Sequence, residues 1–438
     1  MTPETVVDHE ITKLQDGPPA ERTEQSGSLG WYRELDGKQR KTFWACFAGW
    51  SLDAMDVQLY SFIMPALIGL WSLSNSEAGL AASVALLASS LGGWVVGILS
   101  DRVGRVRMLQ ITILWFSFFT FLCAFAQTYE QLLVLRALQG FGFGGEWAAG
   151  AVLIAEVVGP KHRGKGSGFV QSGWAVGWAS AAILYMVFFT LLPDEYAWRA
   201  LFAFGLLPAV LVIFLRRMIE EPETFVRASK NRASAGHHGG FLEIFSPALR
   251  WTTIRACALA IGAHGGFYAI TIWLPTYLHT ELGLSVLTTG GYLAVVILAS
   301  FVGYITGAYL NDYLGRRKTL FLFAAGASVT VAIYMLVPLS QTVVFLMGLP
   351  LGFFPSGVYS GVGTFFSELY PTRVRGSGVG FSYNFGRAVG STFPTLVGLA
   401  STSIALGTAI GLLTAAAYSL TVMAALLLPE TVGKPLDH

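Results

Sequence analysis

The amino-acid sequence predicts an all-α integral membrane protein, with twelve transmembrane helices arranged as two pseudo-symmetric bundles of six. Of its 438 residues, 54% are hydrophobic and only 12% are charged, whereas soluble proteins carry about 25% charged residues. Apolar runs of the roughly 20 residues that a membrane helix needs recur along the chain. Two motifs also repeat at nearly one spacing in the two halves. The excess of apolar side chains is therefore expected to face lipid.

The expected spans fall into two sets of six around a polar stretch. Those of the first half are Thr42–Trp71, Glu77–Ser100, Met108–Ala126, Glu130–Val158, Lys165–Leu192 and Trp198–Met218. Those of the second half are Trp251–Leu282, Thr288–Asn311, Thr319–Leu339, Val343–Tyr370, Gly376–Ala400 and Thr402–Leu428. The polar stretch contains RASKNRASAGHHGG, which is typical of a linker. The predicted division is a tail (1–41), a bundle (42–219), a linker (220–249), a second bundle (250–428) and a tail (429–438).

Lysine and arginine predict which helix ends face the cytoplasm. Cytoplasmic loops of membrane proteins carry the excess of both, and here they follow the second, fourth, sixth, eighth and tenth spans. The alternate loops carry almost none, with Arg199 as the exception. Both termini are therefore expected to be cytoplasmic. Residues 1–30 lack the apolar region of a cleavable signal peptide, and the short loops favour the inner membrane of a bacterium as the location.

Two loop motifs occur twice. GILSDRVGRVR, which contains Asp101, returns as GAYLNDYLGRRK, which contains Asp312, 211 positions later (312 − 101). EVVGPKHRGKGSG, which begins at Glu156, returns as ELYPTRVRGSG, which begins at Glu368, 212 positions later (368 − 156). Two motifs at nearly one offset indicate duplicated halves. Transporters are known with this architecture, in which the substrate site lies near the membrane midplane between the repeats.

The same motifs carry a family resemblance. The G-x-x-x-D-x-x-G-R pattern, repeated in looser form on six plus six helices, resembles the major facilitator superfamily over nearly the whole chain. WYRELDGKQRKTFWACFAGWSLDAMD, RALQGFGFGGEWAAG and WRALFAFGLLP are similar to the sialate and lactate proton symporters and their aromatic-acid relatives, with Ala54 in place of a common glycine. The resemblance implies a monomeric transporter that works by alternating access, with the proton as coupling ion and no other cofactor.

Two carboxylates in the first span are candidates for carrying that proton. A charged residue at the centre of a lipid-facing helix costs roughly 3 kcal/mol on insertion scales, so such residues are expected to face the interior or a cavity. Asp53 and Asp56 are three residues apart and share a helix face. Two carboxylates this close do not both ionise easily, which suits a proton carrier. The alternative is that one of them only joins helices by hydrogen bonds.

The fourth span adds a cation and another carboxylate. Arg136 opens R-x-x-Q-G-x-G-x-G, in which Gly140, Gly142 and Gly144 are expected to let a neighbouring helix approach closely. The resemblance implies that such an arginine lies near the acid of the first helix, as a switch that opens when the aspartate is protonated. A static ion pair is the alternative. Glu146 is a further candidate, either for the proton or for a structural pair.

The eleventh span contains the predicted substrate site. Arg387 follows Asn384 by three residues and Tyr383 by four, so the three share a helix face. A guanidinium group meets a carboxylate bidentately, so Arg387 is expected to bind an anion, with Arg136 as a second cation. A pair between Arg387 and one of the first-helix aspartates is the alternative.

Three further side chains are candidates for lining this site. His264 is the only histidine well inside a predicted span, and Gln171 and Tyr268 lie at membrane depth. A histidine there can titrate, and a hydrogen-bonded structural role is the alternative. For the aromatic residues, plain packing is the alternative.

The repeated loop motifs have a separate predicted role at the cytoplasmic helix ends. Carboxylates there can cap helix N-termini and pair with basic residues of neighbouring loops. The resemblance implies that these networks latch the cytoplasmic gate of the outward-open state and set rates rather than substrate choice. Surface charges that only fix topology are the alternative. The candidates are Asp101, Arg102, Arg105, Glu156, Arg163, Asp312, Arg316, Arg317, Glu368 and Arg375.

The predicted function is proton-coupled symport of a small organic carboxylate of the lactate, sialate, aromatic or muconate type, in a lipid bilayer. A net charge of +2 gives no indication of nucleic-acid binding. No Ser-His-Asp set, phosphate loop or metal motif indicates an enzyme. The alternatives are a proton-coupled exporter or antiporter of the same fold, and a membrane sensor that binds a ligand without moving it.

Overall fold

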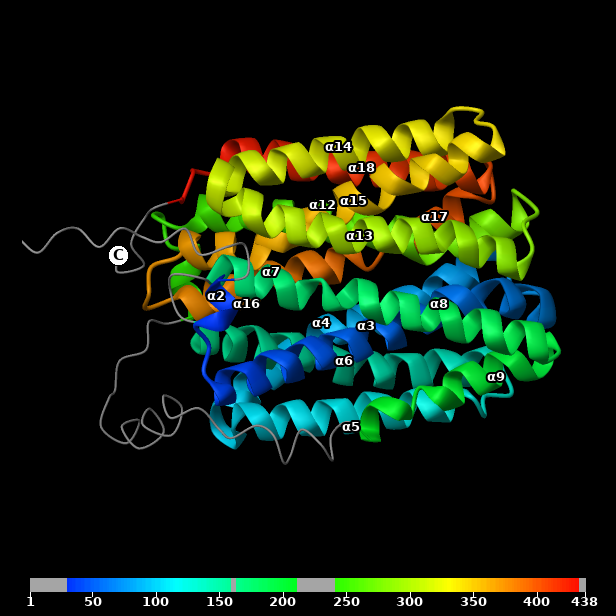
Figure 1. Ribbon diagram of the computed structural model, residues 1–438, viewed down its shortest axis with the longest axis horizontal. Coiled ribbons are helices and arrows are strands. Elements are labelled where there is room, and N and C mark those ends of the chain that lie inside the picture. The colour runs from blue at the N-terminus through cyan, green and yellow to red at the C-terminus, as the bar shows by residue number, and fades with distance from the viewer. Residues whose placement is uncertain (1–29, 159–162, 211–240, 433–438) are drawn as a thin grey trace, which may run out of the picture.

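The computed structural model describes residues 30–158, 163–210 and 241–432, all of whose regular elements are helices that run side by side along the long axis (Figure 1). Within these ranges, the side chains of residues 98, 100–102, 105, 145–158, 163 and 164 are not described. The first half contains α2 (Gly30–Arg33), α3 (Gly37–Trp71), α4 (Asn75–Val103), α5 (Arg105–Cys123), α6 (Tyr129–Val158), α7 (Arg163–Gln171), α8 (Gly173–Leu191) and α9 (Asp194–Phe204). The second contains a 3-10 helix, η2 (Phe241–Phe245), and then α12 (Arg250–Thr280), α13 (Val286–Leu314), α14 (Arg316–Leu336), α15 (Gln341–Leu369), α16 (Arg375–Gly390), α17 (Phe393–Ala400) and α18 (Leu406–Leu427).

Each of the twelve expected spans contains at least one of these helices. In the described part of the chain, nine helical segments are long and apolar enough to cross a membrane, by length and composition. The end of the sixth expected span and most of the linker lie outside the described residues. Most of the two tails also lies outside the described residues.

Two expected spans are interrupted, which the apolar runs did not predict. The fifth is divided into α7 and α8 at Ser172, whose N–H bonds to the carbonyls of both Gly168 and Phe169 (3.1 Å each). Such bonding tightens the helix locally. The eleventh is divided into α16 and α17, and Pro394 lies in the first turn of α17. Proline has no N–H to donate to the carbonyl four residues earlier and is favoured in the first turn of a helix, which is consistent with a new helix starting here, although α3, α12 and α15 continue through internal prolines.

The first long helix begins earlier than its apolar run. Asp36 caps α3 by accepting a hydrogen bond from the Gln39 N–H (2.7 Å), and the Gln39 side chain accepts one from the Asp36 N–H (2.9 Å). This reciprocal cap satisfies two N–H groups that a helix start leaves unbonded. The basic first turn therefore belongs to the helix, although its charges excluded it from the expected span.

The duplicated halves predicted from the loop motifs are also visible where helices touch. A Cβ atom on Gly92 of α4 would overlap the carbonyl oxygen of Phe141 on α6. In the second half, a Cβ atom on Gly303 of α13 would overlap that of Phe353 on α15. The offsets are 211 positions for the glycines (303 − 92) and 212 for the phenylalanines (353 − 141). These offsets match those of the sequence repeats.

The close approach predicted for the glycines of the fourth span is confirmed. A Cβ atom on Gly140 or Gly144 would overlap carbonyl oxygens of α4, and one on Gly142 would press on the backbone and side chains of α5. Small residues of this kind let membrane helices pack backbone to backbone. The helix that carries Arg136 is thus held tightly against two neighbours.

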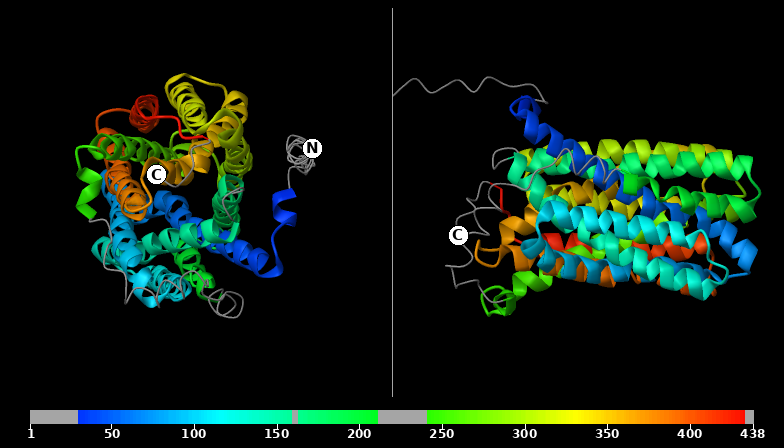
Figure 2. Two further views of the ribbon diagram at one scale, coloured as in Figure 1. Left: turned by 90° about the vertical axis from the view of Figure 1, so that its left-hand side faces the viewer. Right: turned by 90° about the horizontal axis from the view of Figure 1, so that it is seen from below.

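The two halves meet along several helix pairs. Helix α4 packs against α16 and α17, α8 packs against α13, and α3 packs against α12. Seen end-on, the blue to teal helices lie on one side and the yellow to red helices on the other (Figure 2). Near one end, the Lys165 ammonium lies 5.5 Å from the centroid of the Tyr309 ring. Near the other, the Asn75 amide donates to the Ser401 hydroxyl (3.0 Å). The space between the halves is therefore bounded by contacts toward both ends.

The glycine contacts give a testable difference between two positions on α13. Gly303→Ala should destabilise the protein by about 1–3 kcal/mol, because the new methyl group forces α13 and α15 apart. Gly291→Ala, which meets nothing within 4 Å, should be neutral or stabilising by up to about 1 kcal/mol, because alanine favours the helix. Thermal unfolding of the purified protein in detergent measures both. Equal stability of the two variants would contradict the interlocking of α13 and α15.

Candidate functional site

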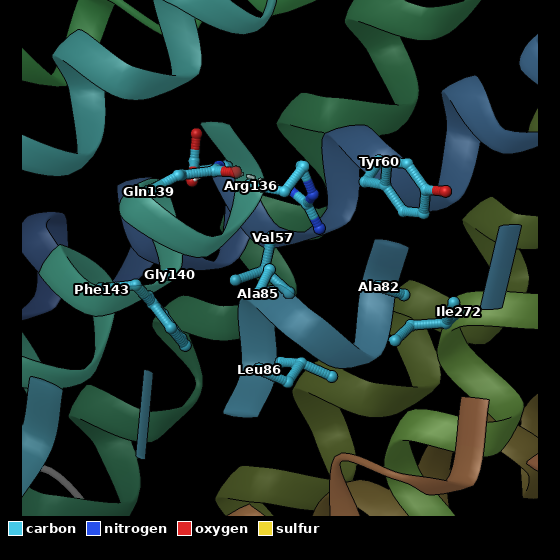
Figure 3. A pocket seen from close by; sticks show the side chains of 11 residues that line it. Val57, Tyr60, Ala82, Ala85, Leu86, Arg136, Gln139, Gly140, Phe143 and Ile272 are labelled. Carbon is cyan, nitrogen blue, oxygen red and sulfur yellow. Dashed lines mark hydrogen bonds between the residues drawn. The ribbon is translucent and has the colours of Figure 1, made fainter. Parts of the chain in front are cut away.

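The first of two cavities lies within the first half. It has a volume of about 20 Å³ and lies between α3, α4 and α6, and Ile272 of α12 borders it from the second half. Figure 3 shows Arg136 and Gln139 close together, with Phe143 further along the same helix. Asp56 and Tyr60 line the same cavity from α3.

Asp56 is the centre of a buried hydrogen-bond chain in this cavity. One carboxylate oxygen accepts a hydrogen bond from the Thr120 hydroxyl (2.5 Å), and the other accepts one from the Gln139 side-chain amide. The Gln139 carbonyl oxygen in turn accepts a bond from Nη1 of Arg136 (2.7 Å). The Arg136 guanidinium also lies 4.4 Å from the centroid of the Tyr60 ring. The opposite charges of Asp56 and Arg136 therefore meet through an amide rather than in a direct ion pair.

This chain can respond to a proton. An ionised carboxylate only accepts hydrogen bonds, whereas a protonated one also donates. Protonation of the oxygen that faces Gln139 would leave two donors facing each other, so the amide would have to turn. Its carbonyl oxygen would then leave Arg136. The predicted aspartate–arginine switch thus has a physical intermediary in Gln139.

The other candidates for the proton are placed differently. Asp53 is fully buried on α3, three residues before Asp56, and it lines neither of the two described cavities. The side chain of Glu146 lies outside the described part of the structure.

The second cavity lies between the two halves. It has a volume of about 20 Å³ and is lined mainly by aromatic rings from both halves. Trp174 of α8 packs 5.9 Å from Phe267 of α12, which packs 5.1 Å from Tyr359 of α15, measured between ring centroids. Five residues predicted for the substrate site line this cavity: Gln171, His264, Tyr268, Tyr383 and Arg387.

Arg387 is the cation of this cavity, and only 1% of its surface is exposed. Its Nη2 lies 3.4 Å from the Tyr383 hydroxyl, and its guanidinium carbon lies 5.4 Å from the centroid of the Phe143 ring. Nε and Nη1 have no hydrogen-bond partner among the described residues. An incompletely bonded charge in the interior is costly. An anion that enters the cavity would supply the missing acceptors.

Glycines on α16 bring this arginine to its position. A Cβ atom on Gly386 would overlap Ala260 of α12, and one on Gly390 would lie 2.7 Å from the Cβ of His264. Helix α16 therefore lies directly on α12. The imidazole Nδ1 of His264 lies 2.8 Å from the Ala260 carbonyl oxygen, which can only accept, so Nδ1 carries the hydrogen. Nε2 is buried without a described partner and is left as an acceptor in the neutral ring.

Asn384 does not line the cavity of Arg387, although its spacing from Arg387 predicts that the two share a helix face. Its amide nitrogen donates to the Gly380 carbonyl (3.0 Å), and its Oδ1 lies 2.6 Å from where a Cβ atom on Gly93 of α4 would be. Asn384 thus contacts the other half at the helix interface and does not line the cavity of Arg387.

Several residues of the two sites were not predicted, among them Gln139 and Phe143, which line the cavities, and Thr120, which bonds to Asp56. Gln139 and Phe143 follow Arg136 by three and seven residues, so helical spacing alone puts them on its face. The signal for both was therefore present in the sequence. Thr120 comes from α5, and no local pattern points from it to Asp56.

The predicted gating residues of the second half form a network within that half. Arg316, at the start of α14, bonds to Asp312 at the end of α13 (2.7 Å) and to Glu368 at the end of α15 (3.1 Å). Glu368 also accepts a hydrogen bond from the Thr431 hydroxyl (2.5 Å). Three helix ends and the segment after α18 are thereby tied together. A latch between the two halves remains a prediction.

The remaining predicted gating residues either make other bonds than those of this network or have side chains that the structure does not describe. The Arg375 guanidinium donates to the Ser367 carbonyl (2.8 Å) and to the Thr372 hydroxyl (3.2 Å), while Glu368 bonds to Arg316. The first-half counterparts have side chains outside the described part, namely those of Asp101, Arg102, Arg105, Glu156 and Arg163.

Glu430 completes the network at the N-terminus of α14. Its carboxylate accepts hydrogen bonds from the N–H groups of Arg316 (2.9 Å) and Arg317 (3.2 Å). Partial burial by itself raises the pKa of Glu430, but these two donors and the N–H groups of Thr431 and Val432 together hold that pKa below its usual value. A negative charge is also favourable at a helix N-terminus.

Glu430→Gln should lower the melting temperature of the protein at pH 7. Because the pKa of Glu430 is lower in the folded state, its contribution is present above the unfolded value of about 4.3 and is lost as pH falls through the folded value. The difference in melting temperature from the parent should therefore shrink between pH 7 and pH 3.5. Glu195→Gln, whose carboxylate makes no hydrogen bond that the structure describes, is the control. A difference that grows on acidification would contradict the assignment.

A helical bundle with duplicated halves, and with a cavity between them that holds an incompletely bonded cation, is typical of a membrane transporter for a small molecule. The chain belongs to the Major Facilitator Superfamily, whose family model matches residues 46–394. It is accordingly a transporter and not an enzyme, and the family resemblance seen in the sequence is confirmed.

Named relatives cover nearly the whole chain. One, from Cupriavidus pinatubonensis, is named a probable 4-methylmuconolactone transporter and is 43% identical over 412 residues, which are 94% of this chain and 95% of the relative. The cis,cis-muconate transport protein of Acinetobacter baylyi is 29% identical over 397 residues, 90% of this chain and 95% of the relative. The structure of a bacterial homologue of the human lysosomal transporter Spinster, inward-facing and unoccupied, shares the fold, with a TM-score of 0.66 at 18% identity over 89% of this chain and 96% of that one.

Proposed function

We propose that the protein carries a small, flat organic carboxylate of the muconolactone or muconate type into the cell together with a proton. The observation that carries the proposal is Arg387, a buried guanidinium that faces the cavity between the halves with two unbonded nitrogens. A carboxylate fits a guanidinium edge with two parallel hydrogen bonds. The names of two relatives, which refer to a muconolactone and a muconate, support this class of substrate.

The walls of the cavity favour an unsaturated substrate over a sugar acid. Indole and phenyl rings of Trp50, Trp174 and Phe267 lie in contact with one another, 5.3 and 5.9 Å apart between successive centroids. Such rings stack on a planar unsaturated body, whereas a polyol would leave several hydroxyls unbonded, at a cost for each. His264 Nε2 offers one acceptor for a hydrogen-bond donor on the substrate.

The proton is assigned to Asp56. Inward movement of one negative charge against 100 mV costs about 2.3 kcal/mol, and a proton carried along cancels that cost. Among the carboxylates with a described environment, Asp56 is bonded through Gln139 to a cation that its ionisation would neutralise. Asp53 and Glu146 remain alternative carriers. Arg136 serves this cluster in the proposal, although it was also a candidate for the substrate.

The proposed orientation places both termini in the cytoplasm of a bacterial inner membrane. The basic turn between α13 and α14 lies at the same end of the bundle as the C-terminal end of α18 (Figure 1). An excess of positive residues marks the cytoplasmic side. The protein is proposed to work as a monomer, by alternating access.

Arg387→Gln should reduce uptake of the substrate by at least about 100-fold, because two charge-assisted hydrogen bonds of about 1.5–3 kcal/mol each are lost. The measurement is uptake into proteoliposomes that are acidic outside, with labelled 4-methylmuconolactone, cis,cis-muconate, benzoate, lactate and sialate. Arg250→Gln, at an exposed position at the start of α12, should leave uptake unchanged. Exchange of organic cations for protons, with no carboxylate moved, would replace the proposal by the antiporter alternative.

Asp56→Asn should abolish accumulation driven by the pH gradient while it preserves exchange of labelled for unlabelled substrate. The amide cannot take up and release the proton, yet it fills the same space. Proton flux on addition of substrate, followed with a pH-sensitive dye, should also vanish. Asp194→Asn, on the exposed start of α9, is the matched control. Normal accumulation by Asp56→Asn would move the proton site to another carboxylate.

A further inference from the structure

We infer that Phe143 is the positioning residue that couples the proton site to the substrate site. The inference rests on the proposed symport and assigns a part of its mechanism to one side chain. Among the described residues, Phe143 is the only one that lines both cavities. Its ring therefore forms a wall that the Asp56 cluster and the Arg387 site share.

Phe143 belongs to the helix face that carries the proton cluster. It follows Gln139 by four residues and Arg136 by seven, and residues at these spacings lie above one another on a helix. Figure 3 shows the three side chains on the same helix. A change in the bonding of Gln139 or Arg136 thus acts on the side chain one or two turns further along.

Phe143 also contacts the cation of the second half. The guanidinium carbon of Arg387 lies 5.4 Å from the ring centroid, within the range of a cation–π contact. Arg387 and Phe143 come from different halves of the molecule. This contact therefore depends both on what occupies the substrate site and on the distance between the two halves.

The backbone that carries Phe143 has little freedom of its own. The contacts of Gly140 and Gly144 hold α6 against carbonyl oxygens of α4. A local adjustment at Phe143 must then come from its side chain, or from α4 and α6 moving together. Either movement displaces the Phe143 ring, which separates the two cavities.

The sign of the coupling follows from the polarity of the two sides. A substrate that fills the aromatic cavity presses the ring toward the Asp56 cluster. An apolar ring near an ionised carboxylate displaces polar surroundings at a cost, whereas a neutral carboxyl group tolerates it. Substrate binding therefore favours protonation of Asp56, and by reciprocity protonation favours substrate binding.

The groups around Asp56 indicate that it is the carboxylate whose charge affects the position of the Phe143 ring. From α4 and α12, the lining consists of the apolar side chains of Ala82, Ala85, Leu86 and Ile272. The titratable, charged or hydrogen-bonding groups around Asp56 are Tyr60 on its own helix, Thr120 and Cys123 on α5, and Arg136 and Gln139 on α6, while Asp53 is buried three residues earlier on α3 and lines neither cavity.

The test compares Phe143→Leu with Phe141→Leu, two residues earlier on the same helix, where the ring packs against Trp115 outside both cavities. The dissociation constant of labelled cis,cis-muconate is measured from pH 6 to pH 8, together with exchange and gradient-driven accumulation. In the parent and in Phe141→Leu, binding should tighten about tenfold on acidification, within the usual range of coupling between sites. In Phe143→Leu, the pH dependence should fall below about twofold and accumulation should drop, while exchange persists.

Further variants guard against a simple folding defect. Phe143→Tyr keeps the ring and should restore the pH dependence, and Phe143→Met replaces Phe143→Leu if the latter does not purify as a monodisperse protein. Parent-like pH dependence and accumulation in Phe143→Leu or Phe143→Met would overturn the inference, as would an equal loss in Phe141→Leu. Failure of the parent itself to bind or accumulate a carboxylate would instead overturn the proposed symport.

Discussion

Charge at membrane depth is the constraint on which the rest of this structure depends. Lipid cannot solvate a carboxylate or a guanidinium, so such side chains must turn inward and bring helices with them. Asp56 draws donors from α5 and α6, and its hydrogen-bond chain is complete on both carboxylate oxygens. Arg387 is buried to the same degree yet has two nitrogens without a described partner. The fully hydrogen-bonded Asp56 cluster holds helices together, whereas the incompletely bonded Arg387 can bind a ligand.

Close helix packing makes that arrangement possible. Glycines at the contacts of α4 with α6 and of α13 with α15 leave no room for a side chain, so the helices of each half are firmly packed against one another. Alternating access needs such packing, since the halves must reorient without losing their internal order. The network around Arg316, Glu368 and Glu430 stabilises one end of the second half in the same way.

The sequence predicts the architecture more fully than the site. Apolar runs, basic loops and the repeat at Asp101 and Asp312 are local signals, and local signals suffice for spans and duplication. Pro394 was a sequence signal for the interruption of the eleventh span, and a prediction from the length of apolar runs did not use it. Arg387 was found because a buried cation is conspicuous, whereas Asn384 shares its face only in part and contacts α4 instead. Thr120 could not be found, because its partner lies 64 positions away on another helix.

The most direct test of the central claim, that Arg387 is the anion site, is a structure of the protein with cis,cis-muconate bound. We expect a ligand carboxylate within about 3 Å of Nε and Nη1 of Arg387, with its unsaturated body against the rings of Trp174 and Phe267. A ligand bound away from Arg387, or an ion pair between Arg387 and either first-helix aspartate in the loaded state, would contradict the account.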